Sequence, residues 1–334
     1  MIHIIKPGLL TTVQDLGRYG YQKYGVITSG VMDHLAHRIA NLLVGNEEKK
    51  ATLEVTLVGP VIQFEKDALI ALSGADLSPT INGKPVRMWR TLFVKKGSKL
   101  KFGRCRQGCR TYIAIAGGIN VPKVMNSQST YLRAGIGGFE GRALEADDRL
   151  VTGELSRLSK DITSIITEEV DDEASELDWS IATSFISTYS SERYLIRTME
   201  GRQFDLFDET SRQVFFENEF KVTTQSDRMG YRLKGANLHV AEAGELISEA
   251  VAFGSVQVPS DGNPIILLAD RQTTGGYPKI GQVATVDFSK LAQMKPGDKL
   301  RFKKITHEEA QVLYLEQEES IQQLRQGILL KARR

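Results

Sequence analysis

The sequence contains few of the residues that mark metal-binding or disulfide-rich proteins. Only two of its 334 residues are cysteines, Cys105 and Cys109, and no histidine lies near them. A structural zinc site takes four thiolate or imidazole ligands, so this pair does not predict one. We expect reduced thiols at a hairpin tip, with a cross-strand disulfide as the alternative.

Long apolar runs and a strong charge imbalance are also absent. No segment approaches the roughly 18 apolar residues of a transmembrane helix. The N-terminus shows no charged-then-apolar signal peptide, which predicts a cytoplasmic protein without a membrane partner. The net charge is +2 and charged residues make up 25%. That balance gives no case for a nucleic-acid partner.

The common catalytic motifs are missing as well. There is no Gly-x-x-x-x-Gly-Lys-Ser/Thr phosphate loop, no Gly-x-Ser-x-Gly elbow and no His-Glu-x-x-His pair. The glycines of residues 135–141 miss the dinucleotide fingerprint because the third falls one position late. His34 and His37 share a predicted helix face, but no further ligand completes a metal set. The favoured interpretation is a solvated face with an Asp33–His37 pair, so no metal site is predicted.

What the sequence does contain is repetition. Three segments of the first half recur in the same order in the second half: residues 14–21 and 225–231, 53–76 and 247–270, and 94–102 and 294–302. Each alone is compatible with chance, but three in order indicate an internally duplicated domain. Glu54 and Glu249 are matched acids of this repeat. We interpret both as structural, with a catalytic role as the alternative.

Short β-branched runs separated by turn residues predict a mainly β fold. Between residues 53 and 118 the turns, among them Asn82-Gly83, suggest a small barrel or sandwich. Residues 11–24 are expected to form a loop. Ser29 is the expected N-cap of a helix that ends near Val44. Thr306 and Glu309 form a capping box for a final helix that is expected to weaken at Gly327.

The predicted domain organisation follows from these patterns. It consists of a first barrel with an N-terminal loop and helix over 1–155, an acidic linker over 156–191, a second barrel over 192–304 and a C-terminal helix over 305–334.

The first candidate site is the glycine-rich stretch of residues 129–142. Glycine lets a backbone approach an anion closely, and an arginine fork binds phosphate or carboxylate. The relevant residues are Arg133, Arg142, Gly137 and Gly138. The alternative is a structural loop whose arginines pair with Glu140 and Glu145.

The second candidate follows the apolar run of residues 265–268. Donors and hydroxyls gather there in segments too polar for a core, which suits recognition of a carboxylate or amide. The candidate residues are Gln257, Ser260, Asp261, Asp270, Arg271, Gln272, Thr273, Thr274, Gly275 and Gly276. The alternative is a broad turn held by internal side-chain-to-backbone bonds. Asp15 and Arg18 form a third candidate, in which mutual pairing within the loop is the alternative.

These same stretches carry a family resemblance. Residues 8–18, 129–142, 226–232 and 253–278 resemble the C subunit of the prokaryotic ATP-dependent 5-oxoprolinase, also called KipA or allophanate hydrolase subunit 2. The family is similar to part of the carboxyltransferase region of urea carboxylase. The resemblance covers nearly the whole chain except the acidic linker and the C-terminal tail.

The resemblance implies two cyclophilin-like β-barrels and a complex with two further chains, a KipI-like B subunit and an A subunit. Such a complex opens 5-oxo-L-proline to L-glutamate with ATP hydrolysis, and the chain alone is expected to be inactive. ATP, accompanied by Mg²⁺, is the implied cofactor, held here or by one of the partners. Within the candidate sites we predict catalytic roles for Arg133, Arg271 and Asp270, and substrate or anion binding for the other residues. The alternatives are a regulatory protein that antagonises KipI, a biotin-dependent carboxyltransferase component, and an inactive scaffold.

Overall fold

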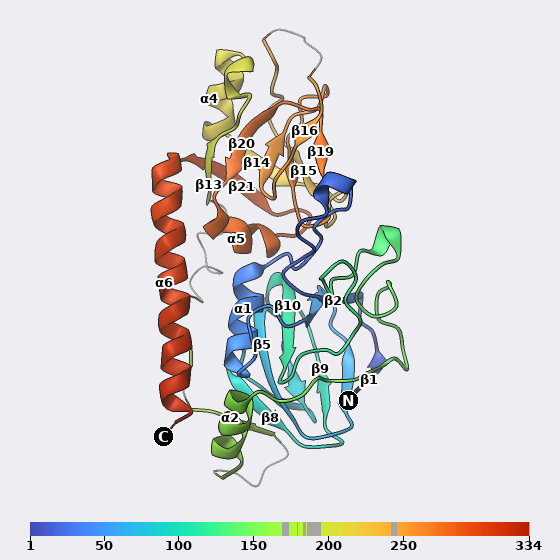
Figure 1. The fold of residues 1–334 in the computed structure, drawn as a ribbon. Coiled ribbons are helices and arrows are strands. Elements are labelled where there is room, and N and C mark those ends of the chain that lie inside the picture. Colours follow the sequence, from blue (N-terminus) through green and yellow to red (C-terminus); the bar gives the residue numbers. More distant parts are fainter. Residues whose placement is uncertain (169–173, 179, 183–184, 186–194, 242–245, 334) are drawn as a thin grey trace. The chain divides into compact units, whose positions relative to one another are not determined.

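The computed structural model describes residues 1–168, 174–178, 180–182, 185, 195–241 and 246–333. The chain divides into two compact units. Unit 1 comprises Met1–Arg18, Asp33–Ile186 and Ser320–Arg334, and unit 2 comprises Tyr19–Met32 and Ser187–Glu319. Both consist mainly of strands, and the described residues include five α-helices (Figure 1). The prediction of a mainly β protein with a C-terminal helix is confirmed.

Unit 1 contains two six-stranded antiparallel sheets. The first has the order β11 (Arg149–Leu150), β1 (Ile2–Lys6), β4 (Val61–Phe64), β9 (Lys99–Lys101), β6 (Thr80–Ile81) and β7 (Lys84–Pro85). The second has the order β12 (Ala174–Glu176), β8 (Thr91–Val94), β5 (Ala68–Asp76), β10 (Gln107–Ile115), β3 (Thr52–Thr56) and β2 (Leu10–Gln14).

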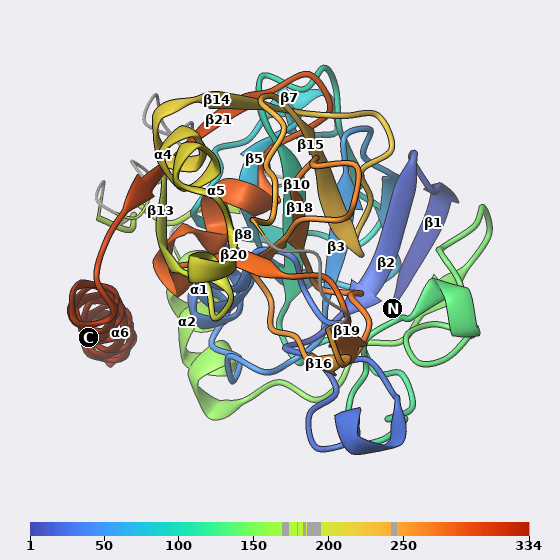
Figure 2. The same cartoon turned by 90° about the horizontal axis from the view of Figure 1, so that it is seen from above.

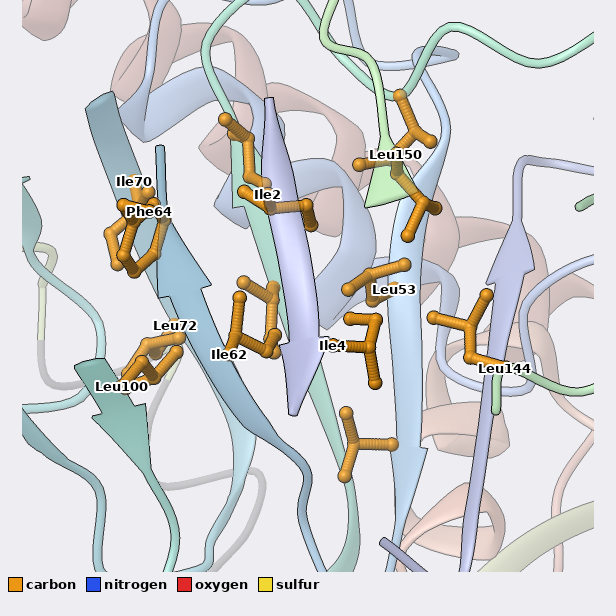
Figure 3. Packing of buried hydrophobic residues seen from close by; sticks show 14 of the residues in the cluster. Ile2, Ile4, Leu53, Ile62, Phe64, Ile70, Leu72, Leu100, Leu144 and Leu150 are labelled. Carbon is orange, nitrogen blue, oxygen red and sulfur yellow. The ribbon is translucent and has the colours of Figure 1, made fainter. Parts of the chain in front are cut away.

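The core of unit 1 lies between these sheets. Alternating residues of the strands, such as Ile2 and Ile4 on β1 and Ile62 and Phe64 on β4, point inward and are fully buried (Figure 3). Burying an aliphatic side chain of this size contributes roughly 1.5–3 kcal/mol. These inward-facing side chains belong to the apolar cluster of unit 1.

The sequence leaves a barrel or a sandwich open for residues 53–118, and in unit 1 the strands form two packed sheets. Strand β5 is buried along almost its whole length, as expected of a strand covered on both faces. Helix α1 (His34–Leu43) packs against β5 and β10 (Figure 1). The hydroxyl of Ser73 on β5 donates to the carbonyl of Ala36 at 2.7 Å. A helix on one face and a sheet on the other favour layers over a barrel.

Helix α1 begins later than the sequence suggests. Its N-cap is Asp33, whose carboxylate accepts the Ala36 N–H at 3.0 Å. Ser29 adopts a positive φ of 52° and is not the cap. His37 is fully buried and its ring nitrogens lie 2.9 Å from Thr52 Oγ1 and 3.3 Å from Asn41 Nδ2. The interpretation of His37 as part of a solvated face is therefore wrong.

Two other segments differ from the expected loops. Residues Leu10–Gln14 form β2 and pair with β3, because their threonines and valine fill a sheet position as β-branched residues do. Within 156–191, helix α2 (Arg157–Glu168) and strand β12 are formed. Most of the acidic run predicted there, residues 169–173, lies outside the described residues.

Unit 2 contains a closed seven-stranded barrel (Figure 2), which confirms a barrel in the second half. Its order is β13 (Leu195–Glu200), β20 (Lys279–Val283), β17 (Ser255–Gln257), β18 (Ile265–Leu267), β15 (Gly230–Lys234), β14 (Glu219–Val222) and β21 (Lys299–Lys304). A parallel pairing of β13 with β21 closes it. Strands β16 (Glu249–Ala250) and β19 (Thr274–Gly275) form a separate pair. Helix α4 (Glu209–Glu217) contributes Phe215, which stacks on Phe302 at 4.4 Å.

The last two helices are α5 (Phe288–Ala292) and α6 (His307–Lys331). The predicted capping box is confirmed. The Glu309 carboxylate accepts the Thr306 N–H at 2.7 Å, and Thr306 Oγ1 accepts the Glu309 N–H at 3.1 Å. Helix α6 continues past Gly327, because a helical glycine costs only about 1 kcal/mol and Ile328 is buried one residue later.

Candidate functional site

The candidate residues of unit 1 form a tightly bonded structure around Asp15. Its carboxylate accepts hydrogen bonds from Ser127 Oγ at 2.7 Å, Ser129 Oγ at 2.5 Å and the backbone N–H groups of Gly17 and Gln128 at 2.9 and 2.6 Å. Four donors satisfy a carboxylate that is only 7% exposed. Asp15 therefore fixes residues 127–129 against the end of β2.

Arg18 lies in the same structure and is completely buried. Its guanidinium donates to the carbonyl oxygens of Val124 at 3.1 Å and Ser129 at 2.8 Å. Gly137 and Gly138 are buried with positive φ, and a Cβ on Gly137 would lie 2.1 Å from Ser129 O. A Cβ on Gly138 would lie 1.8 Å from Thr130 Oγ1. These glycines permit close packing of the loop within the protein.

The two loop arginines have different surroundings. Arg142 forms a bidentate pair with Asp148, at 2.7 and 2.8 Å, and also reaches Glu140 at 2.8 Å. The hydrogen bonds that Arg142 donates to the Asp148 carboxylate raise the pKa of Arg142 above its ordinary value. The guanidinium of Arg142 is therefore bound by Asp148 and Glu140. Glu140 is one of the two partners in the sequence-based alternative, and Asp148 takes the place of Glu145. Arg133 is exposed on a short 3-10 helix, Leu132–Ala134.

In unit 2 the candidate residues gather around Asp270. The Arg228 guanidinium donates to both of its carboxylate oxygens, at 2.9 and 3.1 Å, and to the carbonyl of Gly30 at 2.5 Å. Ser29 Oγ donates to Asp270 Oδ1 at 2.8 Å. Asp270 and Arg228 are each 7% exposed. This buried pair fixes the chain where it leaves β18 and enters residues 271–276.

Arg271 follows this fixed point and differs from both Arg142 and Arg228. Its guanidinium donates to the carbonyl oxygens of Val251 at 3.3 Å and Leu268 at 3.2 Å. No carboxylate of the described residues forms an ion pair with it. Burial lowers the pKa of Arg271 from its ordinary value, yet an arginine remains charged at neutral pH. Arg271 thus offers a partly buried positive charge to an anion.

Gln257 lies beside a charged cluster that the sequence analysis does not predict. Strand pairing sets Gln257 opposite Lys279. The Lys279 ammonium donates to Glu249 at 2.6 Å, and Gln203 Nε2 donates to the same carboxylate at 2.7 Å. The Lys279 hydrogen bond is the main cause of a lowered Glu249 pKa. The only available signal for Lys279 in the sequence is a lysine at the start of an apolar strand.

The amide of Gln257 is itself unusual. The residue is 5% exposed, and its buried Nε2 atom has no hydrogen-bond partner among the described residues. A Cβ on Gly275 would lie 2.4 Å from this atom, so only glycine leaves it space. A buried donor without an acceptor is costly. The structure therefore brings Gln257 and Gly275 together, as two of the predicted site residues.

The remaining predicted residues of unit 2 lie on its surface. Gln272, Thr274, Gly276, Ser260 and Asp261 are exposed, and Thr273 is half-buried. Asp261 accepts the Asn263 N–H at 3.1 Å, an ordinary turn bond. No group of three or more His, Cys, Asp or Glu residues is placed to hold a metal ion in the part of the chain that the structure describes. Nor is any described helix long and apolar enough to cross a membrane.

Comparison with known proteins places this fold in a family. Residues 24–304 match the family described as carboxyltransferase domain, subdomain A and B, and the chain belongs to it. The C subunit of 5-oxoprolinase from Escherichia coli strain K12 is 38% identical over 324 residues, with 97% of each chain covered. The corresponding protein of Haemophilus influenzae is 37% identical over 97% of this chain and 98% of its own. Within the family, the chain belongs with the 5-oxoprolinase C subunits.

Larger proteins contain the same fold. The urea amidolyase of Kluyveromyces lactis matches with a TM-score of 0.86 and 31% identity, covering 97% of this chain but 20% of that one. The urea carboxylase of the same yeast matches with a TM-score of 0.86 and 30% identity, covering 98% of this chain and 29% of its own. The chain therefore corresponds to one part of these enzymes.

Proposed function

We propose that this chain is the C subunit of an ATP-dependent 5-oxoprolinase that opens 5-oxo-L-proline to L-glutamate. The observation that carries the proposal is the match to two 5-oxoprolinase C subunits over 97% of this chain. The designation of these relatives as C subunits implies partner chains. We assign direct contact to a KipI-like B subunit and place the A subunit in the same cytoplasmic complex.

The proposed chemistry requires activation of an unreactive lactam amide. ATP supplies a phosphoryl group that turns the lactam oxygen into a leaving group, and phosphoryl transfer depends mainly on positioned cations and donors. Arg271 binds the carboxylate of 5-oxoproline, because its charge is partly buried and no described carboxylate pairs with it. The buried amide of Gln257 supplies a donor for a substrate oxygen if the segment around Gly275 moves aside on binding.

Asp270 takes a different part in this proposal from Arg271. Both of its oxygens are engaged by Arg228, and one also by Ser29. We therefore propose that Asp270 positions Arg271, the residue next to it, and does not contact the substrate.

Arg133 is proposed as a further anion-binding group because it lies exposed on its short helix.

The fold is proposed to have arisen by duplication of a cyclophilin-like barrel, with the domain bounds 1–155 and 192–304. Support comes from the three repeated segments and from the closed barrel of unit 2. The repeats now lie in different settings. Glu54 belongs to β3, which lies between β10 and β2 in its sheet, whereas Glu249 belongs to the short β16.

A carboxyltransferase activity is the second candidate. The family description and the likeness to urea amidolyase favour it. It requires a biotinylated partner, so transfer of a carboxyl group from biotin by this chain with such a partner would distinguish it. A third possibility, a regulatory chain that only sequesters a KipI-like protein, predicts tight binding without turnover.

Reconstitution tests the proposal directly. Glutamate release from 5-oxoproline and ATP is measured with the chain alone, with the KipI-like protein, and with both partner chains. Activity is expected only in the full mixture. Arg271→Ala should lower kcat/KM at least tenfold, and Arg271→Lys should recover part of it. Arg232→Ala, which removes an exposed arginine of β15, is the control. If Arg133→Ala and Arg271→Ala both leave the complex fully active, the assigned site is wrong.

A further inference from the structure

A cavity of about 630 Å³ lies in unit 1, and all of its lining residues belong to that unit. Its polar lining residues include three lysines, Lys49, Lys50 and Lys123, together with Asn120, Asn126 and Gln128. Small-molecule sites typically occupy a few hundred to a thousand cubic ångströms. The cavity therefore has the size of a ligand site, and none of its lysines belongs to a sequence-predicted site.

The position of Lys50 is built into the fold. Its backbone N–H donates to the carbonyl of Glu47 at 3.0 Å, and its own carbonyl accepts Asn41 Nδ2 at 2.8 Å. Its half-buried stem packs over Gly118, where a Cβ would lie 3.2 Å from the Lys50 Cβ. Gly118 has a φ of +74°. The turn and the glycine together hold this lysine at the cavity wall.

The amide of Gln128 is also held by hydrogen bonds to the backbone. Its Nε2 atom donates to the carbonyl oxygens of Ile119 at 3.2 Å and Val121 at 2.8 Å. Lys50 and Gln128 are therefore held in place before a ligand binds, which lowers the ordering cost of binding.

Three lysines and the carboxylates of Glu47 and Asp15 give this wall a net charge of +1. Neither Lys50 nor Lys123 forms an ion pair with a carboxylate in the described ranges, whereas exposed Lys49 pairs with Glu47 at 3.1 Å. The hydrogen bond from Lys49 is the main cause of a lowered Glu47 pKa. The other carboxylate of the wall, Asp15, is occupied by its four donors. The lysines thus outnumber the acids and favour an anion.

We propose that this cavity binds a small anion that carries a phosphate chain. The wall contains lysines and no arginine. A carboxylate is best recognised by the planar arginine fork, whereas lysine serves as a point charge for phosphate oxygens. Several lysines around one cavity match a ligand with several negative charges. The proposal stands apart from the assignment of the oxoprolinase site in unit 2.

The test measures equilibrium binding of inorganic tripolyphosphate to the isolated full-length chain by calorimetry, without any turnover. We expect saturable binding to one site that weakens as salt is added, because exposed charges are screened. The double variant Lys50→Gln/Lys123→Gln should weaken binding at least tenfold. The matched control Lys84→Gln/Lys101→Gln removes two exposed lysines of unit 1 outside the cavity and should change it less than twofold. An unchanged thermal unfolding midpoint shows that each variant folds.

Two further ligands identify the source of the phosphate chain. Tighter binding of ATP than of tripolyphosphate, lost in the same double variant, supports a nucleotide as the occupant. Equal binding of both supports a phosphate chain alone. Tighter binding of citrate than of tripolyphosphate overturns the phosphate assignment. The proposal is also overturned if wild-type protein shows no saturable binding at low salt, or if both double variants lose binding equally.

Discussion

Two buried arginines at matching positions of the sequence repeat have different bonding partners. Arg18 of unit 1 begins Arg-Tyr-Gly-Tyr and Arg228 of unit 2 begins Arg-Met-Gly-Tyr. Arg18 donates to the carbonyl oxygens of Val124 and Ser129, while nearby Asp15 is satisfied separately by hydroxyl and N–H donors. Arg228 instead pairs directly with Asp270.

This difference shows that two arginines at equivalent positions of a repeat can have different hydrogen-bond partners. Ser129 links the two charges of unit 1, since its hydroxyl donates to Asp15 and its carbonyl accepts from Arg18. In unit 2 a direct bidentate ion pair between Arg228 and Asp270 replaces that arrangement, with Ser29 and the Gly30 carbonyl as further partners. A direct buried ion pair is strongly sensitive to loss of one partner, because the other charge stays behind. Distributed hydrogen bonds should lose less.

The largest expected effect is therefore on the unit 2 pair. Asp270→Asn keeps the shape of the side chain but removes the charge opposite Arg228, which is 7% exposed. We expect a loss of about 3–5 kcal/mol in the free energy of unfolding, measured by urea denaturation. Asp261→Asn changes an exposed carboxylate and should stay within about 0.5 kcal/mol. Equal small losses in both variants would contradict the importance of the pair.

The free energy of unfolding should depend on pH through His37 of unit 1. Burial lowers the pKa of this unit 1 histidine from 6.5 to about 4. Below its unfolded pKa the unfolded chain binds the proton first, so stability falls as pH decreases from 6.5 towards 4. The change amounts to about 3 kcal/mol at most. The histidines of unit 2, His239 and His307, are exposed.

Urea denaturation at several pH values measures this effect. His37→Gln should be less stable at neutral pH but should lose the dependence between pH 6.5 and 4. His239→Gln is the control and should keep it. A wild-type stability that does not change across this window would show that His37 is not held neutral by the fold.

Local signals were enough to predict some elements. The Thr306–Glu309 capping box depends on residues three apart, and the barrel of unit 2 on apolar runs separated by turns. The sequence does not indicate strand β2, because threonine is a polar residue, whereas Thr11 and Thr12 are buried in the sheet.

Contacts between distant segments could not be predicted in the same way. Lys279 joins the Gln257 cluster only because the register of β17 and β20 sets the two residues opposite each other. Glu54, the repeat partner of Glu249, accepts the hydroxyl of Tyr112 at 2.8 Å and is 2% exposed. Glu54 and Glu249 therefore occupy matching positions of the repeat but have different surroundings. Strand pairing, which the repeat does not predict, decides which side chains meet.

The smallest effect is expected at Asp15, and it tests the comparison most sharply. Asp15→Asn keeps one acceptor oxygen. Its NH₂ group replaces the other carboxylate oxygen and would face donors such as Ser127 Oγ and the Gln128 N–H, to which it offers no acceptor. Losing part of such a set costs about 1–3 kcal/mol. Asp147→Asn is a control, because its carboxylate is 87% exposed. Urea denaturation should therefore place Asp15→Asn between that control and Asp270→Asn. A loss as large as that of Asp270→Asn would mean that Arg18 depends on the Asp15 charge, so that both units would rely on an acid to balance the repeated arginine.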